Sequence, residues 1–205
     1  MQPGAIILCG GQSSRMGRDK ATLPFGPELM LQRVIRLVGE VVELKNIVVV
    51  AAPEQLLPPL PADIAIARDH KSGRGPLEGL AAGLEVLERT SSINAIYATS
   101  CDVPLLIPGF VQRMFELVKG YEIAVPCDGQ NFHPLAAVYC PSILVGVRRL
   151  LDADRLRPRF LFDEARTRFV SVDELKGVDP DLRSLINLNR PEDYLTALRM
   201  AGFTE

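Results

Sequence analysis

A short apolar run that leads directly into a glycine-rich and cation-rich segment constrains this chain more than any other feature. Residues 5–8 are Ala-Ile-Ile-Leu, and residues 8–26 read LCGGQSSRMGRDKATLPFG. A buried strand that ends in such a loop presents backbone N–H groups and positive charge together, which suits a polyphosphate. We therefore expect residues 8–26 to form the active site.

The glycines and the cations of this loop have separate roles. Gly10 and Gly11 lack a Cβ atom, so the backbone can turn sharply there and approach a ligand closely. Gly17 permits a second turn before Lys20. Arg15 and Lys20 offer positive charge to phosphate oxygens. The segment thus combines close backbone approach with charge neutralisation.

The order of these residues differs from that of two well-known phosphate-binding loops. A P-loop has Lys directly after its last Gly, whereas here Arg18 follows Gly17. The dinucleotide fingerprint G-x-G-x-x-G also fails, because Ser13 stands two residues after Gly11. The alternative interpretation is a strand-to-helix turn whose charges face water.

Size and composition indicate one globular domain, residues 1–205. The chain has 47% hydrophobic and 23% charged residues, and no apolar run approaches the roughly 20 residues that span a bilayer. A net charge of −2 without a basic run argues against nucleic acid as a partner. No export signal is recognised, so we expect a cytoplasmic protein. Its four cysteines form no C-x-x-C pair and predict neither a zinc site nor a disulfide framework.

Strand-like and helix-like segments alternate along the chain, which predicts an α/β fold with a mostly parallel sheet flanked by helices. The expected strands after the first are residues 47–52, 64–67, 93–100, 123–126, 135–139 and 169–172. The expected helices are residues 28–43, 108–119 and 142–151, one opened by Pro76 and one opened by Pro191.

Two carboxylates follow expected strands. Ligands of open parallel sheets lie outside the carboxyl ends of the strands, so Asp102 is well placed to hold Mg²⁺ against phosphate oxygens. The alternative for Asp102 is a helix N-cap role ahead of Pro104. Asp69 follows another strand, and with His70 it is either close to the ligand or part of a solvated turn.

Several motifs resemble those of the molybdenum cofactor guanylyltransferases, within the wider nucleotidyltransferase family. Their signature L-A-G-G-x-S-x-R-M-G-x-D-K matches residues 8–20, except that Cys9 stands where Ala is usual. The resemblance extends over nearly the whole chain through GPL-x-G-L at 75–80, C-D-x-P at 101–104, D-G-x-x-H-P-L at 128–135 and N-x-N-x-P-E-D at 187–193.

The resemblance implies a single-domain Rossmann-like fold that transfers GMP from GTP to the terminal phosphate of molybdopterin or its molybdenum form. It implies a nucleotide-binding part at about residues 1–105 and an acceptor-binding part at about 106–205. The catalytic residues would be Arg15, Lys20 and Asp102, with Asp102 as the Mg²⁺ ligand. GTP would contact Leu8, Cys9, Gly10, Gly11, Lys20, Asp69 and Asp102. Gly17, Asn187 and Asn189 would face molybdopterin.

Departures from the family pattern keep rivals open. Glu78 stands where Ala is frequent, and Ala51 and Ala52 stand near a position where relatives carry a guanine-contacting Asn. A cytidylyl or sugar nucleotidyltransferase is one rival, and a non-catalytic GTP-binding module of cofactor assembly is the other. His133 is either a general base or a hydrogen-bonded loop histidine beside the acceptor pocket.

Charge and family also set the expected partners. The arginines between residues 148 and 159 form either a solvated face or a surface for an anionic acceptor. The resemblance suggests delivery partners among the proteins of cofactor assembly or the molybdoenzymes. We expect a monomer or a weak homo-oligomer.

Overall fold

One eight-stranded sheet organises the protein. The computed structural model describes residues 2–10, 19–71, 73–90 and 92–203. The strand order is β10-β7-β9-β6-β1-β4-β5, with β8 paired to β7. The strands are β1 (Pro3–Leu8), β4 (Ile47–Ala51), β5 (Ala65–Arg68), β6 (Ala95–Ser100), β7 (Ile123–Asp128), β8 (Asn131–Phe132), β9 (Ala136–Tyr139) and β10 (Thr167–Ser171).

Most neighbouring strands are parallel, as the alternation of elements predicts. Strand β1 lies in the centre between β4 and β6 and is parallel to both, and β4 is parallel to β5. Strand β9 runs antiparallel to β6 and to β7, and it thereby connects the first half of the chain to the second within one sheet. The carboxyl ends of β1, β4, β5 and β6 consequently meet at one edge.

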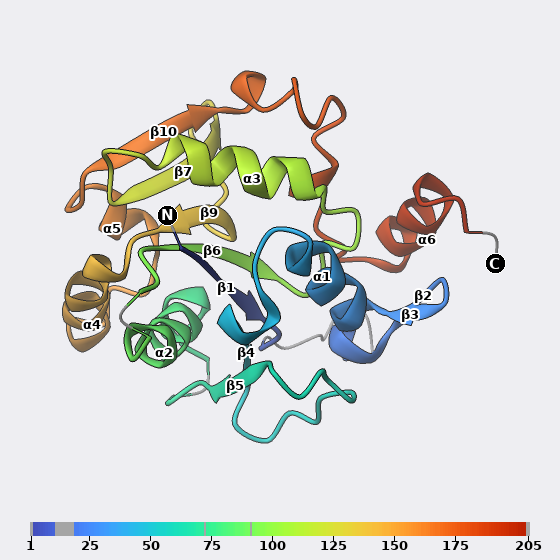
Figure 1. Ribbon diagram of the computed structural model, residues 1–205, viewed down its shortest axis with the longest axis horizontal. Coiled ribbons are helices and arrows are strands. Elements are labelled where there is room, and N and C mark those ends of the chain that lie inside the picture. The colour runs from blue at the N-terminus through green and yellow to red at the C-terminus, as the bar shows by residue number, and fades with distance from the viewer. Residues whose placement is uncertain (1, 11–18, 72, 91, 204–205) are drawn as a thin grey trace.

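Helices cover both faces of the sheet (Figure 1). Helices α1 (Met30–Gly39) and α3 (Pro108–Leu117) pack on one face, and α2 (Pro76–Glu88), α4 (Leu144–Asp152) and the short α5 (Arg159–Phe162) pack on the other. Alternate side chains of β1 supply both cores, since Ile7 belongs to the first cluster and Ile6 to the second. A central strand buried on both faces accordingly reads as a continuous apolar run.

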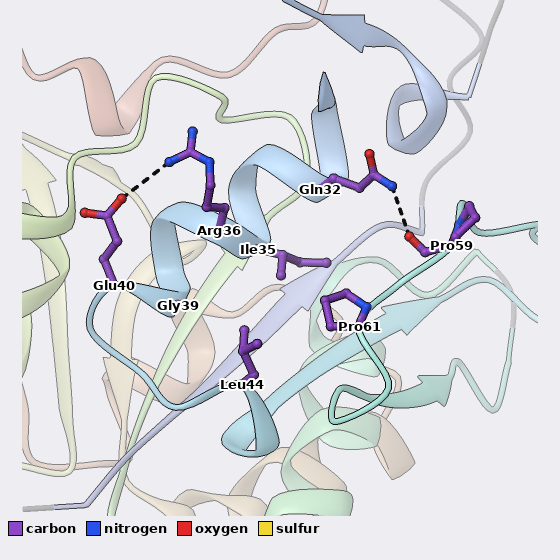
Figure 2. A pocket seen from close by; sticks show the side chains of 8 residues that line it. All are labelled: Gln32, Ile35, Arg36, Gly39, Glu40, Leu44, Pro59 and Pro61. Carbon is purple, nitrogen blue, oxygen red and sulfur yellow. Dashed lines mark hydrogen bonds and ion pairs between the residues drawn. The ribbon is translucent and has the colours of Figure 1, made fainter. Parts of the chain in front are cut away.

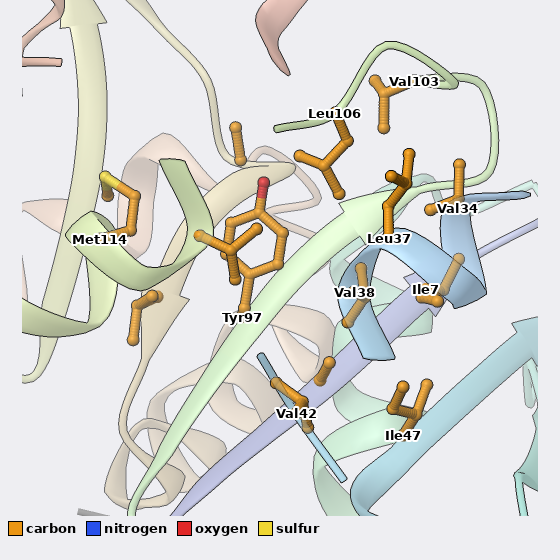
Figure 3. Close-up of a cluster of buried hydrophobic side chains, with 14 of the residues drawn as sticks. Ile7, Val34, Leu37, Val38, Val42, Ile47, Tyr97, Val103, Leu106 and Met114 are labelled. Carbon is orange, nitrogen blue, oxygen red and sulfur yellow. The ribbon is translucent and has the colours of Figure 1, made fainter. Parts of the chain in front are cut away.

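The core between the sheet and helices α1 and α3 is dominated by branched aliphatic side chains (Figure 3). Val34 and Val38 of α1 lie against Ile7 of β1 in this cluster, and Met114 of α3 lies near Tyr97 of β6. Because each helix contributes only its apolar face, the packing fixes the rotation of α1 and α3 about their axes.

A third, smaller cluster holds the C-terminal helix beside the beginning of the chain. Helix α6 (Pro191–Met200) packs on the hairpin formed by β2 (Pro24–Phe25) and β3 (Glu28–Leu29). The ring of Phe25 is buried and meets Phe203 edge to face with centroids 5.8 Å apart. This contact brings the segment before α6 to the end of the glycine-rich loop.

Expected and observed elements differ mainly where segments are short. The helix predicted over residues 28–43 begins at Met30 and ends at Gly39, because residues 28 and 29 pair in the hairpin. The hairpin, β8 and α5 are absent from the sequence-based prediction. The two hairpin strands, β8 and α5 each span only two to four residues, which is too short for hydrophobic periodicity to identify. None of the helices in the described part is both long enough and apolar enough to cross a membrane.

Close packing of α2 on β1 depends on the absence of a side chain at Gly83. A Cβ atom there would lie 2.7 Å from Ile6. We expect Gly83→Ala to lower the free energy of unfolding by about 1–3 kcal/mol through overpacking, measured by urea denaturation. Gly109→Ala in α3 is the control, because its Cβ would lie no closer than 3.9 Å to Val178. That variant should be neutral or stabilising by about 0.4–1 kcal/mol, and equal effects for the two substitutions would contradict the packing argument.

Candidate active site

The backbone pairing of the sheet continues one residue beyond the strand ends and places three segments side by side. The N–H of Cys9 donates to the carbonyl of Val50 at 2.8 Å, and the N–H of Cys101 donates to the carbonyl of Leu8 at 2.9 Å. Asp69 follows β5 in the same way. The predicted residues Leu8, Cys9, Gly10, Asp69 and Asp102 therefore lie along one edge of the sheet.

An ion pair between Lys20 and Asp102 lies at the centre of this edge. The ammonium of Lys20 is 2.7 Å from Asp102 Oδ2, and it also donates to Asn189 Oδ1 at 3.0 Å. The two paired side chains are 17% and 11% exposed, so the charges are partly shielded from water but remain accessible. A cation held beside a carboxylate at strand ends is a suitable arrangement for binding phosphates.

The second carboxylate oxygen of Asp102 is also hydrogen-bonded. Ser100 Oγ donates to Oδ1, and Asn187 Nδ2 donates to the same atom at 2.9 Å. The two asparagines lie on the same side of the chain, as the extended N-x-N pattern predicts. Asp102 does not cap a helix, because α3 begins six residues later at Pro108 with Ile107 as its N-cap.

Gln55 connects the loop to the sheet, and sequence reasoning missed it. Its Nε2 donates to both carboxylate oxygens of Asp19, at 3.0 and 2.8 Å, and to the carbonyl of Cys9 at 3.1 Å. Its Oε1 accepts from the N–H of Ala52. Since Asp19 directly precedes Lys20, these bonds hold the backbone at Lys20 close to the end of β1. No local motif marks this glutamine, because its partners are up to 46 residues away.

Asp69 is packed closely by two glycines, Gly10 and Gly79. A Cβ atom on Gly10 would be 3.1 Å from Asp69 Oδ2, and one on Gly79 would be 3.3 Å from Oδ1. Burial raises the pKa of the Asp69 carboxyl, the negative charge of Glu78 raises it further, and His70 opposes the shift. Asp69 is therefore a half-buried carboxylate beside the loop and not part of a fully solvated turn.

Glu78, which departs from the family pattern, His70 and several of the arginines between residues 148 and 159 all form ion pairs within the protein. Glu78 is buried, and its Oε2 lies 3.6 Å from Arg74 Nη1, so it pairs with the turn that precedes α2. His70 is exposed and pairs with Glu85 at 3.0 Å. The arginines between residues 148 and 159 include three in surface ion pairs, which supports a solvated face: Arg148 with Glu85, and Arg149 and Arg155 with Glu164.

A pocket of about 200 Å³ opens beside Asn187. His133 lines it, together with Phe132 of β8 and Pro76, the first residue of α2. Burial lowers the pKa of the His133 imidazole, partly opposed by the negative charge of Asp128, so the ring is mostly neutral at pH 7. His133 thus lies in the region that the sequence assigns to the acceptor.

A larger pocket, of about 530 Å³, lies on the outer side of α1 and is separate from these residues (Figure 2). Gln32 and Arg36 of α1 line one side, and Pro59 and Pro61 line the other. None of the predicted site residues that the structure describes contributes to its walls. Volume alone therefore does not identify the functional site here.

Three predicted site residues lie outside the described part of the chain, and the backbone N–H of a fourth, Cys9, already forms a hydrogen bond. Gly11, Arg15 and Gly17 lie outside the described residues. The backbone N–H of Cys9 is already bonded within the sheet, which leaves its carbonyl as the group with spare hydrogen-bonding capacity. All four cysteines are free thiols, and those at positions 9 and 101 are buried, as expected for small apolar side chains.

The described acidic residues could hold a metal ion through one carboxylate, Asp102, and not through a group of three ligands. Within the described residues, no three His, Cys, Asp or Glu side chains are grouped so that they could hold a metal ion. Asp102 is nevertheless a single, largely buried carboxylate that already pairs with a cation, Lys20. This donor set fits Mg²⁺, which takes one or two carboxylates and completes its shell with substrate phosphates and water.

Comparison with known proteins places the chain in a family. Residues 5–167 match the family model described as the MobA-like NTP transferase domain. A protein from Mycolicibacterium paratuberculosis named probable molybdenum cofactor guanylyltransferase is 36% identical, with 98% of this chain and 97% of the relative covered. One of the same name from Pelotomaculum thermopropionicum is 30% identical, with 98% and 94% covered.

Solved structures agree on the fold. The molybdopterin-guanine dinucleotide biosynthesis protein A from Archaeoglobus fulgidus superposes with a TM-score of 0.80 at 18% identity, over 97% of this chain and 98% of that one. A cytidylyltransferase from Leptospira borgpetersenii gives 0.71 at 17% identity, over 100% and 89%. This chain has the nucleotidyltransferase fold, matches the family model over most of its length and has relatives that match it over nearly their full length. It therefore belongs to the MobA-like NTP transferase family, among the molybdenum cofactor guanylyltransferases.

Proposed function

We propose that this protein transfers GMP from GTP to the terminal phosphate of molybdopterin, or of its molybdenum form, giving the guanine dinucleotide cofactor and pyrophosphate. Family membership supports the reaction class. The observation that carries the proposal for this chain is the hydrogen-bonded group of Lys20, Asp102, Asn187 and Asn189 at the carboxyl edge of the sheet. It brings the predicted nucleotide side and the predicted acceptor side together around one carboxylate.

The chemistry is an in-line displacement at phosphorus. An oxygen of the acceptor phosphate attacks the α-phosphorus of GTP, and the bond from that phosphorus to the bridging oxygen breaks. Pyrophosphate departs with the electron pair. Because the attacking phosphate is already ionised at neutral pH, little proton removal is needed. The protein must mainly position two anionic groups and reduce their repulsion.

The described residues supply that positioning. Lys20 would place its ammonium against the triphosphate, with Asn189 limiting its rotation through the 3.0 Å hydrogen bond. Asp102 would hold Mg²⁺, which supplies positive charge at the reacting phosphates. Ser100 and Asn187 orient the carboxylate by bonding its other oxygen, Oδ1. Arg15, which lies outside the described residues, would add a second positive charge.

The nucleotide and the acceptor would approach from different sides of Asp102. Gly10 and Asp69 lie toward β4 and β5, where the lack of a side chain at Gly10 lets its backbone pack closely against Asp69 and Ala52. Asn187 borders the pocket on the side of β8 and β9. In this proposal the nucleotide-binding part lies at about residues 1–105 and the acceptor-binding part at about 106–205.

The Asp102 carboxylate should be essential for turnover. We expect Asp102→Asn to lower kcat by at least about 100-fold, because the amide keeps the shape of the side chain but loses the charge that holds Mg²⁺. Circular dichroism and thermal unfolding would establish that the variant is folded. Asp152→Asn, an exposed position at the end of α4, is the matched control. A near wild-type rate for Asp102→Asn would refute the metal assignment.

Gln55 should act on nucleotide binding through Asp19 and Lys20. Gln55→Ala removes the donor to the Asp19 carboxylate, and we expect roughly tenfold lower kcat/KM for GTP. Leu56→Ala, at the next residue and with an 85% exposed side chain, should leave kcat/KM unchanged. Steady-state kinetics with varied GTP concentration would give kcat/KM for both variants. Equal kcat/KM values would show that Gln55 does not act on GTP through Asp19 and Lys20.

Nucleotide preference separates the proposed reaction from its rivals. We expect MgGTP to raise the midpoint of thermal unfolding more than MgCTP, MgUTP or MgATP, because a ligand at 100 times its Kd adds about 2.7 kcal/mol to the stability. A chelator should reduce the shift, and added Mg²⁺ should restore it. A larger shift with CTP or UTP would indicate a different nucleotidyltransferase. GTP binding without turnover on molybdopterin would indicate a non-catalytic module.

A further inference from the structure

The pocket beside Asn187 has the features of a binding site for a flat, polar ring. It measures about 200 Å³, and its walls include Phe132, Pro76 and Leu185, with His133 and Asn187 as polar groups. Apolar walls with a few placed hydrogen-bonding groups are typical of small-molecule sites. The nucleotide contacts proposed above do not use any of these wall residues.

The aromatic wall of the pocket is held rigidly from behind. Phe132 packs edge to face on the buried Phe162, with ring centroids 5.6 Å apart, and it meets Phe169 at 5.5 Å. Pairing of β8 with β7 also fixes its backbone opposite Cys127. A ring that is already ordered loses little conformational entropy when a ligand stacks on it. Phe132 is therefore a preorganised stacking surface.

The polar side chains of the pocket can recognise a heterocycle that carries both donors and acceptors. His133 has its backbone N–H bonded to Pro126 O at 2.9 Å and its carbonyl bonded to the N–H of Ala136 at 3.1 Å, which fixes its position. As a neutral imidazole it offers one donor and one acceptor. Asn187 donates through Nδ2 to Ser100 and Asp102, so its Oδ1 is the atom that can accept from a ligand.

The position of the pocket relative to Asp102 identifies the molecule that would occupy it. Asn187 lines the pocket and at the same time bonds Asp102 at 2.9 Å, so a ligand in the pocket lies next to the reacting phosphates. Resting on the proposed function, we infer that this pocket holds the pterin ring of the acceptor, with Phe132 stacking on the ring and His133 bonding its edge. The phosphate of the same molecule would then reach Asp102.

Two pairs of matched variants test this inference, with 6-hydroxymethylpterin as a fluorescent probe. We expect His133→Leu and Phe132→Leu each to weaken binding of the probe roughly tenfold, the loss of about one ligand hydrogen bond or stacking contact. The controls are His70→Leu, the only other histidine of the chain, and Phe160→Leu, whose ring contacts Arg155 and does not line the pocket. Both controls should bind the probe like the wild type.

Kinetic and nucleotide measurements distinguish recognition of the ring from a structural effect. The pocket variants should raise the KM for molybdopterin and leave the KM for GTP and the thermal shift with MgGTP unchanged. If MgGTP does not shift the unfolding midpoint of the wild-type protein, the proposed function is contradicted. The probe titration would still show whether the pocket binds a pterin ring. If neither probe binding nor the acceptor KM differs between pocket variants and controls, the inference is wrong.

Discussion

The partly buried carboxylate of Asp102 is the interaction on which the rest of the site depends. A charged group at this depth must be paired and hydrogen-bonded, and Lys20, Ser100 and Asn187 together meet that requirement. These partners come from the beginning, the middle and the end of the chain. The hydrogen bonds to this one carboxylate therefore hold the three segments together. They also leave the Lys20 ammonium and the Asp102 carboxylate side by side where phosphates would bind in the proposed reaction.

The fold provides this convergence through the order of its strands. Strand β1 is central and β6 is its parallel neighbour, so the loop after β1 and the turn after β6 emerge at the same edge. The last segment reaches that edge because α6 packs on the β2–β3 hairpin, where Phe25 contacts Phe203. The distant apolar cluster around Phe25 thus helps to place Asn189 against Lys20.

Two neighbouring regions of the edge differ in chemistry. Around Gly10 and Asp69 the backbone and a half-buried carboxylate pack closely together, because Gly10 and Gly79 carry no side chains that would crowd Asp69. Around Phe132 and His133 the surface is aromatic and the titratable group is neutral. In the proposed reaction the first region would take the nucleotide and the second the uncharged ring of the acceptor, and Asn187 connects the second region to Asp102.

The sequence by itself determined the alternating elements, the loop after the first strand, the Asp102 carboxylate at a strand end and the family, because these depend on local periodicity and on ordered motifs. It also predicted that Asn187 and Asn189 lie on the same side of the chain. Only the tertiary structure decided the role of Gln55, which contacts Asp19 across 36 residues. Only the structure revealed the hairpin and the Phe132 wall, because such short elements form through long-range packing and leave no periodic pattern.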